Sequence, residues 1–211
     1  MSDLLPIFPL PSVVLFPGVF LPLHIFEPRY RDMVADALST DRMIGMALLK
    51  EGWESDYEGR PPVYAVGCSG LITHAEHLPD GRYNIILRGL DRFRILHEDH
   101  ARAYRRALTE PLHEPTLSSA DKIMLKGQRA RIESLLSPSG QSAGIDPRAA
   151  AALADDDLIN ALAQYLDLDA IEKQALLEKP SIPDRAGALI ELLEMRSMLA
   201  RTPSSSSAQA H

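Results

Sequence analysis

The repeat of hydrophobic residues changes near Pro115, and this change constrains the fold more than any other feature. Before Pro115, short apolar runs alternate with turns rich in Gly, Pro and Asp, as in antiparallel strands. After it, apolar residues recur three and four positions apart, which is typical of amphipathic helices. We therefore predict an α+β protein, with an antiparallel β-barrel or sandwich over residues 1–115, an α-helical bundle over 116–201 and a disordered tail over 202–211.

Prolines are concentrated at the start of the chain. Six of the sixteen lie between Pro6 and Pro28, among Leu, Ile, Val and Phe residues that call for burial. Because proline cannot donate a hydrogen bond inside a sheet, short extended pieces with kinks or bulges are expected here. Glu27-Pro28 is a typical helix start. In Phe16-Pro17-Gly18, we expect Gly18 to take a positive φ in a tight turn.

Further elements follow from periodicity and breakers. We expect strands over 43–50, 63–78, 83–88 and 92–95, a last strand over Ala103–Leu108, and turns at the Gly-containing breaks between them. Helices are expected over Ser118–Leu136, from Asp155, from Asp169, where Glu172 stands at capping-box spacing, and from Ser181 or Pro183 to about Arg201.

Composition limits the classes of function. The formal charge of −7 and the pI of about 5.5 argue against nonspecific binding to nucleic acid or anionic lipid. No apolar run approaches the roughly 20 residues that cross a bilayer, and we expect no export signal, because an acid and prolines stand in the N-terminal segment. A single cysteine, Cys68, precludes an intrachain disulfide and fits a reducing cytoplasm. We expect a cytoplasmic protein.

Catalytic signatures are weak. No phosphate-binding loop, dinucleotide fingerprint, His-Glu-x-x-His motif or Gly-x-Ser-x-Gly elbow occurs in the chain. Cys68 could act as a nucleophile with a base such as His74, but lone cysteines in apolar strands are usually buried and inert. We expect no enzyme activity, neither ATPase nor peptidase, and no catalytic residue.

Two histidine pairs raise the question of a metal site. They are His74-Ala-Glu-His77 and His97-Glu-Asp-His100. Since side chains alternate along a strand, residues three apart point to opposite faces. We interpret the four as surface histidines, and expect no metal and no cofactor.

Arginines cluster in the later part of the predicted barrel, where the local charge is positive. A basic strand face could bind RNA phosphates, or it could pair with acids of the helical part. An exposed stripe would favour the RNA alternative, and pairing would disfavour it; Phe93 should face the core. The alternative nucleic-acid patch consists of Arg88, Arg92, Arg94, Arg102, Arg105 and Arg106.

The polar loop over 51–60 carries the only tryptophan of the chain. Large aromatics in a polar loop either anchor the loop or contact a partner. The surrounding acids would favour basic, apolar segments. We predict a peptide-binding surface at this loop and at the groove where barrel meets helices, formed by Glu51 and, chiefly, Trp53, Tyr57, Glu54, Asp56 and Glu58.

Three stretches together resemble one family. The first is Pro9–Met33, with Pro-Leu, Phe-Pro-Gly, Pro-Leu and Glu-x-Arg-Tyr; the second is Gly67–Ile95, and the third is Asn160–Glu178 followed by Arg185. The chain resembles, from about Leu4 to Leu199, the N-terminal substrate-recognition domain of ATP-dependent Lon proteases, especially its stand-alone bacterial versions. A related domain occurs in cereblon.

The resemblance implies a PUA-like β-barrel followed by an α-helical subdomain. It also implies recognition of unfolded or exposed polypeptide, in connection with a protease or chaperone system, without the ATPase and peptidase activities of the full protease. It supplies no catalytic residues. Because PUA-like barrels of other families bind RNA, RNA binding through the arginines is the alternative function.

Overall fold

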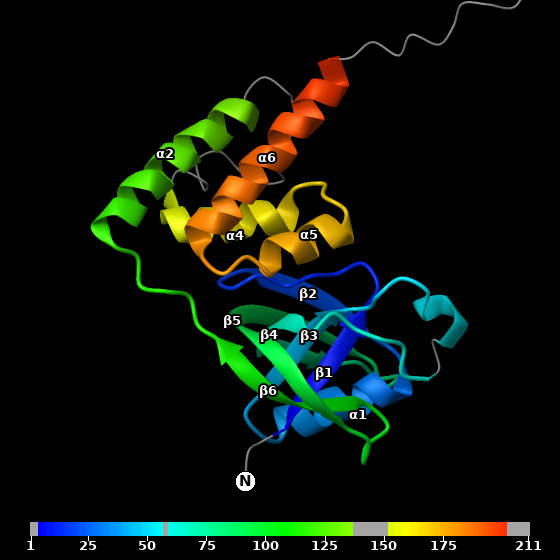
Figure 1. Ribbon diagram of the computed structural model, residues 1–211. Coiled ribbons are helices and arrows are strands. Elements are labelled where there is room, and N and C mark those ends of the chain that lie inside the picture. The colour runs from blue at the N-terminus through cyan, green and yellow to red at the C-terminus, as the bar shows by residue number, and fades with distance from the viewer. Residues whose placement is uncertain (1–3, 57–58, 137–151, 202–211) are drawn as a thin grey trace, which may run out of the picture.

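The computed structural model describes residues 4–56, 59–136 and 152–201. A barrel of strands lies at one end of the molecule, and a layer of helices covers one side of it (Figure 1). The barrel part contains β1 (Leu5–Leu10), β2 (Phe20–Ile25), α1 (Pro28–Leu38), β3 (Met43–Leu48), β4 (Val66–His77), β5 (Tyr83–Asp99) and β6 (Arg105–Leu112). The helical part contains α2 (Ser119–Leu136), α4 (Asp155–Tyr165), α5 (Ala170–Leu177) and α6 (Ile182–Arg201).

The long strand β5 organises the sheet. The strand order is β2-β5-β4-β3-β1-β6, and a further pairing of β5 with β6 closes the ring. Strand β2 lies outside this ring, paired with the first half of β5. The α+β class with a barrel is thus confirmed. The expected antiparallel pairing has one exception, since β1 and β3 run parallel; the connection through β2 and α1 is long enough for such a crossover.

The last strand differs from the expectation of Ala103–Leu108. It spans Arg105–Leu112, and its register with β5 extends from Asp99↔Arg106 to Arg92↔Leu112. The strand continues to Leu112 because the 17 residues of β5 provide a partner as far as that residue.

The turn before β2 forms as expected. Gly18 has a φ of +77°, and the Val19 amide donates to the Phe16 carbonyl at 3.3 Å, which makes a turn with Gly18 at its third position. The Gly18 amide donates to the Gly89 carbonyl at 2.9 Å, and the Gly89 amide donates to the Val19 carbonyl at 2.8 Å. Gly18 and Val19 therefore both oppose Gly89, as in a glycine-type β-bulge, and this bulge starts β2.

Helix starts follow the sequence signals. Pro28 occupies the first turn of α1, and the Asp169 amide donates to the Glu172 carboxylate at 2.8 Å, so the predicted capping box before α5 is confirmed. The stretch over 137–147, rich in Ser, Gly and Pro and expected to form a loop, and the predicted tail over 202–211 both lie outside the described residues. Within the described ranges, no helix has the length and hydrophobicity to span a membrane.

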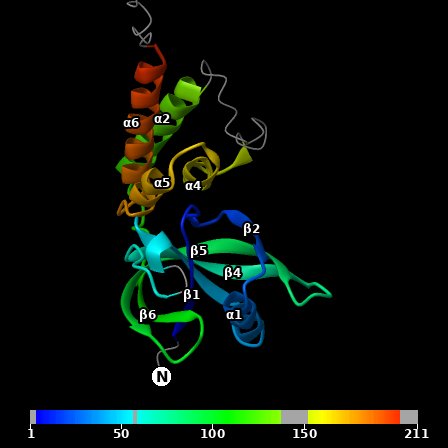
Figure 2. The same cartoon turned by 90° about the vertical axis from the view of Figure 1, so that its right-hand side faces the viewer.

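One hydrophobic core connects the barrel and the helices. The main cluster includes Phe16 and Leu87 of the barrel part together with Leu162 of α4 and Leu189 of α6. A smaller cluster around Phe93 fills another side of the barrel, as expected for that residue. Helices α2 and α6 lie side by side and extend away from the barrel (Figure 2). A division into domains at residue 115 stays a prediction.

Candidate functional site

A groove lies where the loop after β3 faces α5. The short 3₁₀ helix η1 (Trp53–Asp56) forms one wall, and the N-terminal end of α5 forms the other. The volume of the groove is about 510 Å³. It thus lies at a junction between the barrel and helical parts, which is a common location for binding sites.

The floor of the groove is apolar and its rim is acidic. Leu48 and Leu49 are buried beneath it, while the side chain of Ile171 is 49% exposed. Trp53 and Tyr64 add aromatic surface, and Lys50 Nζ lies 5.7 Å from the ring centroid of Tyr64. The carboxylates on the rim belong to Glu51, Glu54, Asp169 and Glu172.

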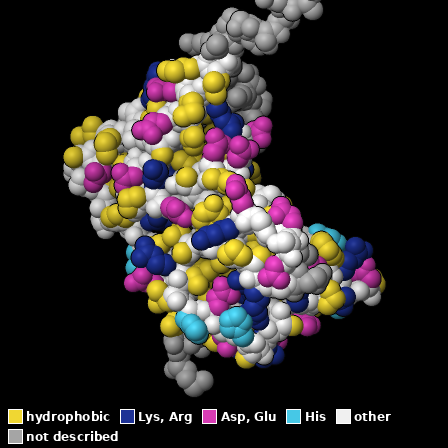
Figure 3. All heavy atoms as spheres, turned by 45° about the vertical axis from the view of Figure 1, so that its right-hand side comes forward, with side chains coloured by type: hydrophobic (Ala, Val, Ile, Leu, Met, Phe, Trp, Pro, Cys, Tyr) yellow, Lys and Arg dark blue, Asp and Glu magenta, His cyan; other side chains and the backbone are white. Residues whose placement is uncertain are grey.

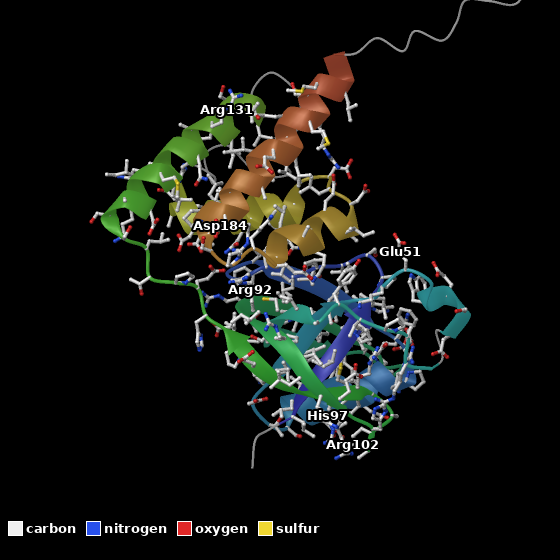
Figure 4. The ribbon with its side chains drawn as sticks, viewed as in Figure 1. Glu51, Arg92, His97, Arg102, Arg131 and Asp184 are labelled. Atoms are coloured by element: carbon white, nitrogen blue, oxygen red, sulfur yellow. The ribbon has the colours of Figure 1, made fainter. Side chains whose placement is uncertain are left out.

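The four rim carboxylates come from both parts of the chain. Glu51 and Glu54 are exposed on the loop, and Figure 4 shows Glu51 at the edge of the barrel below α5. Asp169 and Glu172 belong to the capping box of α5, and Glu172 also accepts a hydrogen bond from Arg196 at 2.8 Å. Because Arg196 pairs with Glu172, the carboxylates that would attract cationic side chains of a ligand are chiefly those of Glu51, Glu54 and Asp169.

Hydrogen bonds to backbone carbonyls fix the loop that carries Trp53. The Lys50 amide donates to the Pro62 carbonyl at 2.8 Å, and Ser55 Oγ donates to the Gly52 carbonyl at 3.0 Å. Arg60 donates to the carbonyls of Asp99 and Arg102 at 3.3 and 3.0 Å. Trp53 itself is half-buried and belongs to neither core cluster, so it does not plug the barrel.

Sequence reasoning identified only one wall of this groove. Of the predicted residues, Glu51, Trp53 and Glu54 line the groove; Asp56 is exposed but lies outside the lining, and Tyr57 and Glu58 lie outside the described residues. The α5 wall was missed. Its signal was the Asp169/Glu172 capping box, which places two carboxylates at a helix start, but nothing in the sequence indicated what that helix end faces.

The structure distributes the six arginines over different surfaces. Arg92 and Arg105 are buried, at 3% and 8% exposure. Figure 4 shows Arg92 below the helices and Arg102 at the opposite end of the barrel. On the face in Figure 3, basic side chains are interspersed with acidic ones.

Most of these arginines have acidic partners. Arg105 donates to Glu98 at 2.8 Å, Arg106 pairs with Asp99, and Arg102 lies 3.6 Å from Asp36. Arg88 and Arg94 are exposed. The six therefore do not form one basic stripe.

The burial of Arg92 removes it from an exposed basic strand face, which is the arrangement that the RNA alternative requires. Arg92 donates to the carbonyls of Leu177 and Pro180 at 3.1 and 3.0 Å and to that of Lys179. Its Nε lies 3.0 Å from Glu114. The reason is that the segment after α5 covers this outer face of β5, which alternation along the strand could not reveal.

A second buried arginine, Arg185 of α6, shares Glu114 with Arg92. Its guanidinium donates to Glu114 at 2.8 Å, to Asn160 Oδ1 at 2.7 Å and to the Leu176 carbonyl at 3.1 Å. Burial lowers the pKa of this guanidinium below its usual range, while Glu114 opposes that shift. Arg92, Glu114 and Arg185, which we call the arginine clamp, join the barrel to the helices.

Cys68 and the histidines do not assemble a reactive centre. Burial raises the pKa of the Cys68 thiol to about 12, which keeps it protonated at neutral pH, and His74 is exposed on the same strand. His97 and His100 are also exposed. Within the part of the chain that the structure describes, no three His, Cys, Asp or Glu side chains are grouped for metal binding.

Comparison with known proteins identifies the family. The model of the ATP-dependent protease La (LON) substrate-binding domain matches residues 4–195. This chain belongs to the Lon substrate-binding domain family. The resemblance drawn from the three motif stretches is therefore confirmed.

Relatives share the domain at moderate identity. Lon protease 2 of Myxococcus xanthus is 26% identical over 199 residues, covering 92% of this chain and 24% of the relative. The Lon protease of Escherichia coli K12 is 24% identical over 195 residues, covering 90% and 24%. This Lon-type chain thus spans about a quarter of the length of the curated relatives it matches.

Solved structures show the same fold. The N-terminal domain of the Mycobacterium avium complex Lon protease superposes with a TM-score of 0.69 at 18% identity, covering 91% of this chain and 98% of that one. The Lon N-terminal domain protein from Xanthomonas campestris gives 0.57 at 24% identity, covering 95% and 99%. At these identities the likeness establishes the Lon N-terminal fold.

Proposed function

We propose that this chain is a non-catalytic recognition module for unfolded or exposed polypeptide, and that the groove between η1 and α5 is its binding surface. The observation that carries the proposal is the apolar floor under four carboxylates drawn from both parts of the chain. Membership of a substrate-binding domain family supports the same function.

The chemistry of the groove selects the ligand class. Apolar side chains of an extended segment would contact Trp53, Tyr64 and Ile171, and Lys or Arg side chains would meet the rim carboxylates. Charge complementarity of this kind adds specificity and raises the association rate. The ligand is therefore a basic, apolar segment that a folded protein would bury.

The relatives that contain this domain are named as proteases, and the family model describes their substrate-binding part. We carry over only recognition, and propose that a bound segment passes to a protease or chaperone partner. The scattered arginines, most with acidic partners, do not favour the RNA alternative.

Binding can be tested with two unfolded chains of opposite charge. Reduced and alkylated lysozyme is basic, and reduced and alkylated α-lactalbumin is acidic; the basic chain should bind more tightly. A basic, apolar peptide without tryptophan should in addition shift the fluorescence of Trp53, the single tryptophan of this chain. Trp53→Ala should weaken binding of the basic chain by about 1–2 kcal/mol if the indole is an anchor. Titration calorimetry measures both affinities.

Charge variants separate the groove from general electrostatics. Glu54→Lys should reduce the preference for the basic chain. Glu110→Lys makes the same charge change on the exposed outer part of β6, away from the groove, and should leave that preference unchanged. Equal affinities of a folded Trp53→Ala protein and the wild type would remove this groove as the site.

A further inference from the structure

Strand β2 has one edge that no other described strand covers. It pairs with β5 in antiparallel register from Phe20↔Arg88 to Ile25↔Tyr83, and it ends the strand order. An uncovered strand edge presents backbone donors and acceptors to any extended chain that approaches it.

The direction of the backbone groups follows from the bulge that begins β2. The Val19 carbonyl bonds to β5 through the Gly89 amide. Antiparallel strands alternate between bonded and non-bonded pairs. The backbone N–H and C=O groups of Leu21, Leu23 and Ile25 therefore also point toward β5, and those of residues 20, 22 and 24 point outward. Pro22 fits this alternation, since its nitrogen has no hydrogen to donate to β5.

The outward groups define what we call the β2 outer edge. It consists of the backbone of Phe20, Pro22 and His24. The Phe20 carbonyl already accepts a hydrogen bond from Tyr165 Oη at 3.0 Å. Among the described strands only β5 pairs with β2, and Phe20, Pro22 and His24 are exposed, so a ligand can reach the Phe20 amide, the Pro22 carbonyl and both backbone groups of His24.

Exposed aromatic rings flank this edge. The side chains of Phe20, Phe26 and Tyr165 are 51%, 61% and 48% exposed. Phe20 begins β2, Phe26 follows its last residue, and Tyr165 holds the Phe20 carbonyl. Rings of this size at both ends of an uncovered strand provide apolar contact for the side chains of an added strand.

Negative charge lies beside the first end of the edge. Asp156 and Asp157 are exposed in the first turn of α4, and Asp157 Oδ1 is 3.0 Å from the position of a Cβ on Gly18. A Lys or Arg in the ligand would meet these carboxylates by charge complementarity.

From these observations we infer that the β2 outer edge binds an extended polypeptide segment as an added strand, with apolar side chains near Phe20 and Phe26 and a basic residue near Asp156 and Asp157. The inference rests on the proposed function in that the ligand is a polypeptide. It adds a second site, with backbone recognition, to the side-chain recognition of the groove.

Pro22 makes a peptide a better occupant than a second copy of this chain. If two copies paired edge to edge by two-fold symmetry, each copy would lack the Pro22 donor, so the short interface would lose two hydrogen bonds. A complex with a single peptide strand loses only one. Proline on an edge strand is a known device against self-pairing.

The test uses one short fluorescein-labelled peptide of alternating valine and threonine with lysine at both ends. His24→Pro removes an outward N–H, while His24→Ala is its matched control: both lose the imidazole and its contacts with Asn84 and Arg82, but alanine keeps the N–H. Fluorescence anisotropy should show binding to His24→Pro about fivefold weaker than to His24→Ala, the equivalent of one hydrogen bond. Pro22→Ala, which adds a donor, should bind about fivefold more tightly than the wild type.

A peptide variant covers the case in which His24→Pro does not fold. Two further versions of the peptide carry N-methyl groups on alternate backbone nitrogens, one on the odd-numbered and one on the even-numbered residues. The version that is methylated on the edge facing β2 should lose binding to the wild type. Retained binding of both versions would overturn strand addition.

Other outcomes would place the peptide elsewhere. If His24→Pro and His24→Ala bind the peptide with equal affinity, and Trp53→Ala binds it more weakly than the wild type, strand addition is overturned and the groove is the site. A wild-type dimer that His24→Pro dissociates in sedimentation would assign the edge to a second copy and overturn the inference. If neither this peptide nor alkylated lysozyme binds, both the inference and the proposed function fail.

Discussion

At the scale of single residues, Gly18 connects the start of β2 to the helices. Its φ of +77° is strained for any residue with a Cβ, and a Cβ there would lie 3.0 Å from Asp157 Oδ1. The turn thus depends on glycine for two reasons, one in the backbone and one in the packing against α4.

Gly18→Val should therefore destabilise the protein by roughly 1–3 kcal/mol through backbone strain. Gly127→Ala in α2 is the control, since a Cβ at that position meets nothing within 4 Å and alanine favours a helix. Urea unfolding followed by circular dichroism measures both. A Gly18→Val protein as stable as the wild type would contradict the strain argument.

At the scale of elements, the starts of α2 and α6 are fixed by short side chains. Before α2, Ser118 Oγ accepts from the Asp121 amide at 3.1 Å, and the Asp121 carboxylate accepts from the Ser118 amide at 2.9 Å. The same Ser-x-x-Asp spacing occurs at Ser181 and Asp184 before α6. These pairs satisfy amides that the helix itself leaves without partners.

Ser118→Ala should cost about 1 kcal/mol of stability, because the helix loses this cap. Ser119→Ala is the matched control: it is the next serine, is exposed and opens the helix without capping it. Urea midpoints compare the two variants. A larger loss for Ser119→Ala than for Ser118→Ala would reverse the assignment of the cap.

Local elements were accessible from the sequence because their signals are local. Pro28, the Asp169/Glu172 spacing and the Pro-Gly turn each act within a few residues, so they predicted α1, the start of α5 and the φ of Gly18. Contacts between distant segments carry no such signal. The parallel β1–β3 pair, the burial of Arg92 under Lys179 and the α5 wall of the groove depend on which segments meet in space.

At the scale of the whole molecule, the arginine clamp holds barrel and helices together. Arg185 is fully buried and contacts α4, the end of α5 and Glu114 before α2, while its guanidinium carbon lies 5.9 Å from the ring centroid of Phe16. Removing a buried charge that several groups share leaves those groups without partners.

Arg185→Leu should accordingly destabilise the protein by about 3–5 kcal/mol. Arg131→Leu is the control, since Arg131 pairs with Glu194 between α2 and α6 on the exposed surface, where such pairs contribute at most about 1 kcal/mol. Chemical unfolding of both variants measures the loss in the free energy of unfolding. Equal losses would show that the arginine clamp contributes no more stability than a surface ion pair.

The closing pair of the barrel joins two strands that a ribosome makes at different times. Strand β1 needs β6 as a neighbour, and Leu5 pairs with Ala107, so the two edges that close the ring are separated by most of the barrel sequence. Bringing such distant segments together carries a loop-closure cost and slows folding. While a ribosome makes this chain, the early apolar strands leave the exit tunnel long before their last partner, and chaperones can bind them until β6 emerges.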